Sequence, residues 1–111
     1  MEALVGGGLP DPAIQEKRLA SLKPTSRYAG GASYSLALAQ FGPFIGHDGT
    51  LPGFQSFMGH DPITESTLVV FTNLNLARDG LETANLIARD IIGLLFSASP
   101  ADATPVASPT A

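Results

Sequence analysis

The sequence contains no cysteine and no tryptophan, and only 14% of its 111 residues are charged. The absence of cysteine excludes disulfide scaffolds, thiolate-bound zinc and thiol nucleophiles, but it does not identify a compartment. Six basic residues against ten acidic ones give a net charge of −4, without a run of like charges. A nucleic-acid-binding protein needs a clustered basic surface, so we do not expect nucleic acid as a partner.

Long apolar runs are also lacking. The longest one, Ile91–Phe96, is far shorter than the roughly 20 residues that span a bilayer, so no transmembrane segment is predicted. Met1–Val5 has neither basic residues nor a long apolar core, and no signal peptide is visible there. These features predict a soluble chain of one domain at most, and they leave its localisation unknown.

The pattern along the chain predicts two helices, four strands, a third helix and a tail. Met1–Val5 is a short apolar segment stopped by three glycines, and Pro12 opens a second helix that runs to Leu22 before Lys23-Pro24 ends it. Residues 97–111 consist only of Ser, Ala, Pro, Thr, Asp and one Val. Such a composition cannot bury enough apolar surface to fold, so a disordered tail is predicted there.

Four segments have the patterns of strands. Alternation of apolar and small residues predicts a strand over 33–39, and short apolar runs predict strands over 44–47 and 54–58. Residues 48–53, rich in Gly and Pro, read as a bend between them. The run 67–72 is apolar on both faces, which is typical of a strand buried from both sides.

The last helix follows a pair that resembles a capping box, Asp79 and Glu82. Apolar residues at helical spacing then form one stripe: Leu81, Ala84, Ala88, Ile91 and Leu95. Short links favour antiparallel hairpins, so the predicted class is α+β, an antiparallel sheet with the C-terminal helix packed on one face. Nothing else in the chain is suited to cover the second face, from which we infer that part of the fold is missing.

One stretch is specific enough to resemble a known family. It reads Phe-Ile-Gly-His-Asp-Gly-Thr-Leu-Pro-Gly-Phe-Gln-Ser over 44–56, followed by Leu-Val-Val-Phe-Thr-Asn over 68–73. This pattern resembles the C-terminal end of the serine β-lactamase and D-alanyl-D-alanine carboxypeptidase superfamily, nearest to its class C-like, penicillin-binding-protein-like enzymes and esterases. The resemblance covers residues 1–96 and implies an incomplete portion of a β-lactamase-like, serine transpeptidase-like fold, with Met1 falling inside the family's domain.

The resemblance also implies which chemistry is present and which is absent. The family uses a Ser-x-x-Lys nucleophile motif, a Tyr-x-Asn or Ser-x-Asn motif, and a Lys-Thr-Gly or His-x-Gly motif on a strand. Only the third is found, as His47-Asp48-Gly49, because Ser21-Leu-Lys23 has the wrong spacing and neither tyrosine begins a Tyr-x-Asn. The chain is therefore expected to be a hydrolase fragment that is inactive alone.

Four residues receive roles from this resemblance. The backbone N–H of Thr50 would be one oxyanion-hole donor, and His47 would supply a hydrogen bond or a positive charge near the nucleophile. Gly49 would allow close approach of the substrate. Asp48 replaces the usual Thr and would repel a substrate carboxylate, which favours neutral or amine-bearing esters and amides.

Other interpretations stay open. His47 could be a structural histidine, and the neighbouring glycines could simply form a hairpin turn. The two His-Asp pairs, 47–48 and 60–61, lie beside turns with side chains that alternate between faces, so neither a metal nor a cofactor is predicted. Three functions remain: a hydrolase fragment that acts on a small ester or amide once an N-terminal part completes it, a binding or assembly module, and a truncated gene product. An uncovered sheet would favour self-association.

Overall fold

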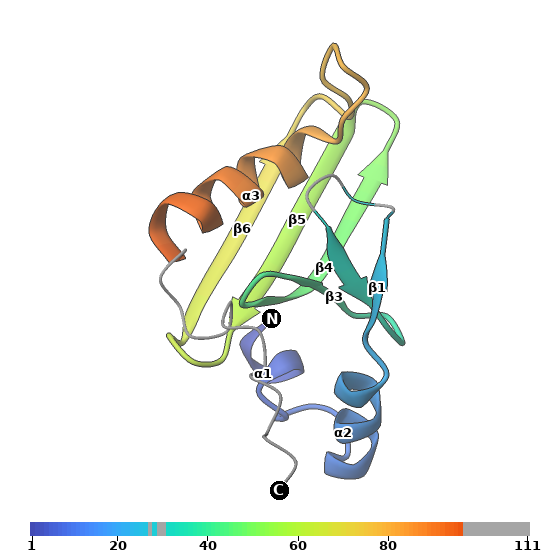
Figure 1. The fold of residues 1–111 in the computed structure, drawn as a ribbon, viewed down its shortest axis with the longest axis vertical. Helices are drawn as coiled ribbons and strands as arrows, with labels where there is room; N and C mark the ends of the chain where they lie inside the picture. The colour runs from blue at the N-terminus through green and yellow to red at the C-terminus, as the bar shows by residue number, and fades with distance from the viewer. Residues whose placement is uncertain (27, 29–30, 97–111) are drawn as a thin grey trace, which may run out of the picture.

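The computed structural model describes residues 1–26, 28 and 31–96, and it shows an antiparallel sheet with two helices at one end and a third helix across one face (Figure 1). The elements are α1 (Glu2–Val5), α2 (Pro12–Ala20), β1 (Lys23–Thr25), β2 (Ala32–Tyr34), β3 (Ala39–Phe41), β4 (Phe44–Leu51), β5 (Phe54–Asp61), β6 (Ser66–Thr72) and α3 (Thr83–Phe96). The strands pair in sequence order from β1 to β6. The α+β class and the helix packed on one face are confirmed. Within the described ranges, no helix is long and apolar enough to cross a membrane.

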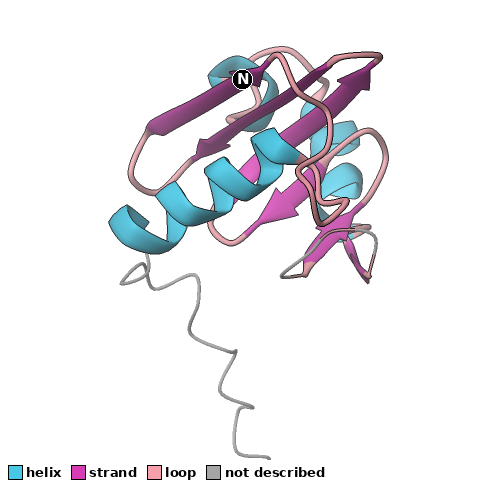
Figure 2. Cartoon of the chain, turned by 90° about the horizontal axis from the view of Figure 1, so that it is seen from above, coloured by secondary structure: helices cyan, strands magenta, loops and turns pink. Residues whose placement is uncertain are grey.

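Helix α3 lies against β5 and β6 on one face of the sheet (Figures 1 and 2). The core between them consists of Phe44, Phe57, Ala84, Ala88 and Ile92, with Phe41, Leu68, Val70 and Phe96 packed around it. The first turn of α3 is fixed to the sheet because the buried Gln55 accepts the N–H of Ala84 at 2.6 Å. The hydroxyls of Thr72 and Thr83, 2.8 Å apart, add a second polar contact at the same place.

The opposite face of the sheet is largely bare where β4, β5 and β6 run side by side. Val69 is 50% exposed and Phe71 is 74% exposed, whereas Leu68 and Val70, which alternate with them along β6, are half-buried under α3. Leu51 and Phe54, at the hairpin between β4 and β5, are exposed as well. Strand β6 is thus covered on one face only, and the expectation of burial on both faces is wrong for the described part of the chain.

The strand predicted over 33–39 is in fact a hairpin. Strands β2 and β3 are joined by a turn in which Ala37 has a φ of 55° and the N–H of Ser35 donates to the carbonyl of Leu38 at 2.8 Å. The turn contains Leu38, which is apolar because its side chain is completely buried. The alternation of apolar and small residues in the sequence therefore runs through the turn without a break. Local alternation therefore did not distinguish one strand of seven residues from two short strands.

Two further boundaries differ from the predicted ones. The bend expected over 48–53 is mostly strand, since β4 continues to Leu51 and only Pro52 and Gly53 turn the chain. Helix α3 begins at Thr83, because the carboxylate of Asp79 accepts the N–H of Leu81 and forms a separate turn rather than a helix cap. The buried stripe of α3 accordingly contains Ile92, whereas Leu95 is exposed.

Helices α1 and α2 lie together at the end of the sheet near the N-terminus (Figure 1). The side chain of Asp11 caps α2 by accepting the N–H of Ala13 at 2.9 Å, and Gln15 joins the two helices by donating to the carbonyl of Val5 at 2.8 Å. Strand β1 begins at Lys23, where the sequence predicted only a helix end. The predicted tail over 97–111 lies outside the described residues.

Candidate functional site

The His47-Asp48-Gly49 segment lies in the part of β4 that has a strand on only one side. Strand β3 pairs with β4 only between Phe44 and Gly46, whereas β5 pairs with it as far as Leu51. From His47 onward, no strand of the described chain adjoins the second edge of β4. Along such an edge every second backbone N–H points away from the sheet and can bind an external acceptor.

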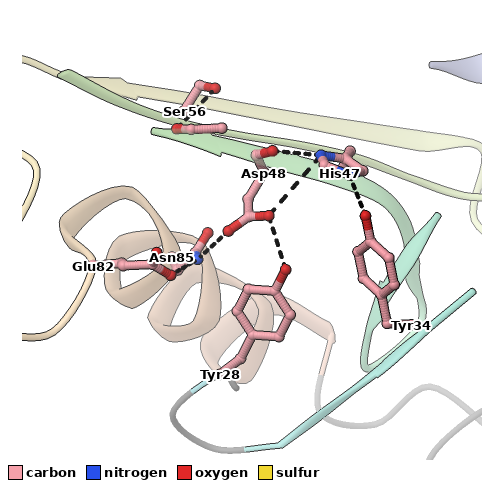
Figure 3. A network of polar contacts seen from close by, with 8 residues as sticks. Tyr28, Tyr34, His47, Asp48, Ser56, Glu82 and Asn85 are labelled. Atoms are coloured by element: carbon pink, nitrogen blue, oxygen red, sulfur yellow. Dashed lines mark hydrogen bonds and ion pairs between the residues drawn. The ribbon is translucent and has the colours of Figure 1, made fainter. Parts of the chain in front are cut away.

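The imidazole of His47 is 41% exposed, and its Nδ1 is 4.0 Å from a carboxylate oxygen of Asp48 (Figure 3). Its Nδ1 contacts the backbone carbonyl of Asp48, and its Nε2 is 2.8 Å from the hydroxyl of Tyr34 (Figure 3). A carbonyl oxygen only accepts hydrogen bonds, so Nδ1 carries a proton, and in the neutral ring Nε2 then accepts the Tyr34 hydroxyl. The two contacts together hold the ring in one orientation.

The carboxylate of Asp48 points towards α3, and only 4% of the side chain is exposed. It accepts the hydroxyl of Tyr28 at 3.0 Å and the side-chain amide of Asn85 at 2.9 Å (Figure 3). The same amide also donates to Glu82 at 2.8 Å. The site of Asp48 is thus a buried polar contact between the sheet and the helix. A direct contact between Asp48 and a substrate stays a prediction.

Gly49 and Thr50 are exposed and continue β4 beyond these two residues. A Cβ on Gly49 would lie 3.0 Å from the hydroxyl of Ser56 on β5, so even a methyl group would press on that side chain. An open pocket of about 750 Å³ adjoins both residues, and its wall includes Leu51, Phe54 and Phe71. This pocket offers an apolar surface with a few hydroxyl groups, and it extends from the end of β4 across β5 to β6.

Gly46 is the position of the motif at which the backbone requires glycine most strictly. It is paired with Gly59 across β4 and β5, and a Cβ on Gly46 would lie only 1.9 Å from the carbonyl oxygen of Met58. The two strands therefore approach more closely here than any side chain would allow. This close approach fixes β4 against β5 immediately before His47.

The second His-Asp pair does not join the first. His60 is 4% exposed and bonds through Nδ1 to the hydroxyl of Thr67 at 2.9 Å, whereas the carboxylate of Asp61 accepts the N–H of Ile63 at 2.9 Å. Both residues therefore stabilise the link between β5 and β6. The residues placed in the structure contain no group of three His, Cys, Asp or Glu side chains that could hold a metal ion.

Sequence reasoning missed the residues that orient the motif. Tyr34 bonds to His47, while Tyr28 and Asn85 bond to Asp48 from a loop and from α3. Neither tyrosine begins a Tyr-x-Asn pattern, so the sequence motifs assigned no role to them. The available signal was composition, because the chain has just two tyrosines and both precede the motif by a short distance.

Comparison with protein-family models, with curated proteins and with solved structures finds no match to this chain. The class that the structure itself defines is an antiparallel sheet with a C-terminal helix on one face and an exposed His-x-Gly segment at a strand edge.

Proposed function

We propose that this chain is the C-terminal part of a β-lactamase-related serine hydrolase, in which β4 forms one wall of the active site. The observation that carries the proposal is the position of the His47-Asp48-Gly49 segment. It begins where β4 leaves β3, its imidazole is 41% exposed, and its Gly49 lines the pocket of about 750 Å³. A small ester or amide would lie along this edge, where free N–H groups can bind its carbonyl oxygen.

Each residue of the motif then has a distinct task. The N–H of Thr50 is the proposed oxyanion donor, and Gly49 leaves room for the acyl group of the substrate. His47 presents a hydrogen-bonding group to the reacting centre, oriented by Tyr34. Asp48 receives a different task from the one that the sequence suggested: it holds β4 to α3 through Asn85 and so positions the imidazole that precedes it.

The chemistry requires a nucleophile and a base that this chain does not supply in the family's pattern. An activated serine needs a base within hydrogen-bond reach, and the sequence has no Ser-x-x-Lys. The proposal therefore includes an N-terminal part, joined to this chain or separate from it, that carries the nucleophile motif and the Tyr-x-Asn motif. Without that part the chain has no acyl-transfer activity.

The DNA upstream of the Met1 codon gives the first test. An in-frame or neighbouring coding sequence with Ser-x-x-Lys and Tyr-x-Asn is expected, and the completed protein should hydrolyse chromogenic esters or a chromogenic cephalosporin. His47→Ala in that protein should lower kcat while leaving the melting temperature nearly unchanged. An upstream region that encodes neither motif would refute the proposal, and so would full activity in the His47→Ala variant.

Asp48→Thr in the completed protein separates the two tasks considered for Asp48. A residue that contacts the substrate would change the preference between carboxylate-bearing and neutral esters. A residue that only positions β4 would lower turnover of both kinds of ester alike. The burial of the Asp48 carboxylate under α3 favours the second result.

The bare face of the sheet favours a second candidate, a binding or assembly module without catalysis. Exposed apolar residues on β4, β5 and β6, among them Phe54, Val69 and Phe71, suit a protein partner better than water. The same experiment distinguishes the two candidates. A completed protein that forms a stable assembly but shows no turnover would identify the module.

A further inference from the structure

The two edges of the sheet differ in how well they are protected against pairing with another strand. Strand β1 has three residues and includes Lys23 and Pro24, two residue types that discourage the addition of a strand. Strand β6 has seven residues, Ser66–Thr72, without a charge, a glycine or a proline. Its outer edge is therefore a long, unprotected row of backbone hydrogen-bonding groups.

Helix α3 adds an apolar surface directly beside this edge. Asn85 and Phe96 lie on the side of the helix that faces β4, since they contact Asp48 and Phe44 respectively. Successive residues turn by about 100° around a helix. Ile87 and Leu94 consequently lie on the opposite side, the one that overhangs the edge of β6. Leu94 is 84% exposed and Ile87 is 44% exposed.

We propose that β6 and the outer side of α3 form a symmetric interface with a second copy of this chain. In this dimer the two β6 strands pair in antiparallel fashion, and the two-fold axis is perpendicular to the sheet and passes midway between the two Val69 residues. The two sheets become continuous, and both α3 helices lie on the same face. This proposal does not depend on the hydrolase function.

The spacing of the elements fits a second copy in particular. Neighbouring strands lie about 4.8 Å apart, so the axis passes about 2.4 Å outside β6. Helix α3 contacts both β5 and β6 and crosses them obliquely (Figure 1). At the point where it crosses the line between the two strands, its axis lies about 4.8 Å from the two-fold axis, measured in the plane of the sheet. The two helices would then be about 10 Å apart, within the distance of about 8–10 Å at which helices pack. Ile87 and Leu94 would fill the space between them.

The sequence of β6 is compatible with pairing to itself. About Val69, the strand places Thr67 opposite Phe71 on the bare face and Leu68 opposite Val70 under the helices. No charged side chain faces a like charge in this register, which removes the repulsion that usually disfavours self-pairing. A second copy therefore satisfies the strand edge and the helix side at the same time.

Sedimentation of the full chain over a wide concentration range tests the proposal, and a reversible monomer–dimer equilibrium is expected. Leu94→Glu should weaken the dimer at least tenfold, because it brings two carboxylates into the contact between the helices. Leu36→Glu is the matched control, since Leu36 is also exposed but lies in the turn between β2 and β3. The dimer of the Leu36→Glu variant should have the same dissociation constant as the dimer of the original chain. A monomer at every concentration, or a dimer that Leu94→Glu does not weaken, would overturn the proposal.

The absence of cysteine permits a direct test of the register. Chains with Thr67→Cys and chains with Phe71→Cys are purified separately and oxidised either alone or as an equal mixture. Because residue 67 faces residue 71 of the other copy, the mixture should form disulfide-linked dimers in much higher yield than either variant alone. Equal cross-linking in all three samples would contradict the register and indicate unspecific aggregation. Both positions are exposed on β6, so the substitutions should leave the fold intact.

Discussion

Replacement of Asp48 by alanine tests whether the centre of the motif is a structural contact between sheet and helix. The carboxylate is 4% exposed and accepts two hydrogen bonds, one from Tyr28 and one from Asn85. Asp48→Ala removes both acceptors and leaves a buried hydroxyl and a buried amide without this partner. A hydrogen bond to a charged group contributes about 1.5–3 kcal/mol, and two bonds to one carboxylate are not fully additive. We therefore expect the free energy of unfolding to fall by about 3 kcal/mol.

Urea and thermal unfolding, followed by circular dichroism at one protein concentration, measure this loss. For a domain of this size, about 3 kcal/mol corresponds to a melting temperature lower by roughly 10–20 °C. Asp79→Ala is the matched control, because the Asp79 carboxylate accepts a single backbone N–H at 3.0 Å in an exposed turn. Asp79→Ala should lower the free energy of unfolding by only a small fraction of the amount expected for Asp48→Ala. A common protein concentration is needed because association would itself stabilise the folded chain.

A double-mutant cycle then assigns the loss to a particular contact. Asn85→Ala removes the amide that bonds to both Asp48 and Glu82. If the sheet and the helix are joined as the structure shows, Asp48→Ala and Asn85→Ala should be coupled by more than about 1 kcal/mol. Coupling near zero, or an Asp48→Ala variant that melts with the original chain, would refute a structural role for this carboxylate. It would then restore the earlier expectation that Asp48 faces a substrate.

Three further outcomes are expected. Gly46→Ala should lower the free energy of unfolding by about 1–3 kcal/mol, because the added methyl group overpacks against β5. Gly93→Ala lies in α3, where nothing is within 4 Å of the added methyl group. It should raise the free energy of unfolding by about 0.5–1 kcal/mol in the same urea titration. The chain alone should not be labelled by a fluorophosphonate or a fluorescent penicillin, and labelling of a defined serine that denaturation abolishes would contradict this. In the completed enzyme, Tyr34→Phe should reduce kcat less than His47→Ala does, because it frees the imidazole without removing it; stopped assays at saturating substrate would show the order.

The sequence was sufficient to predict the class of the fold, the C-terminal helix and the strands around the motif. These elements have strong local signals, namely a helical stripe on α3 and β-prone runs bounded by Gly and Pro. The errors occurred where a tertiary contact decides the local conformation. Ala37 has a positive φ immediately before Leu38, which is completely buried. The turn at Asp79 lies in a loop that is closed by the hydrogen bond from the N–H of Thr83 to the carbonyl of Asn75 at 3.0 Å.

The direction of each side chain in the motif could be predicted only in relative terms. Period-2 alternation requires that His47 and Asp48 lie on opposite faces of the sheet. It does not reveal which face α3 covers, because that depends on where the chain returns after β6. The helix packs over Asp48, so the aspartate became the buried member of the pair and the histidine the accessible one. Tyr28 and Asn85 could not be assigned to the site for the same reason, since 57 residues separate them and only the completed fold brings both to Asp48.

The hydrolase proposal and the dimer proposal involve different surfaces of the same sheet, so each can be refuted without affecting the other. The hydrolase proposal uses the edge of β4 and the bare face, whereas the dimer uses the edge of β6 and the outer side of α3. If an N-terminal part docks only on the bare face, the completed enzyme should remain a dimer, and Leu94→Glu should dissociate that dimer. If that part instead adds a strand to β6, it must displace the second copy, and the completed enzyme should be a monomer in which Leu94→Glu weakens the attachment of the N-terminal part. Sedimentation of the completed protein with and without Leu94→Glu therefore shows which surface the partner occupies, whether or not His47 proves to be catalytic.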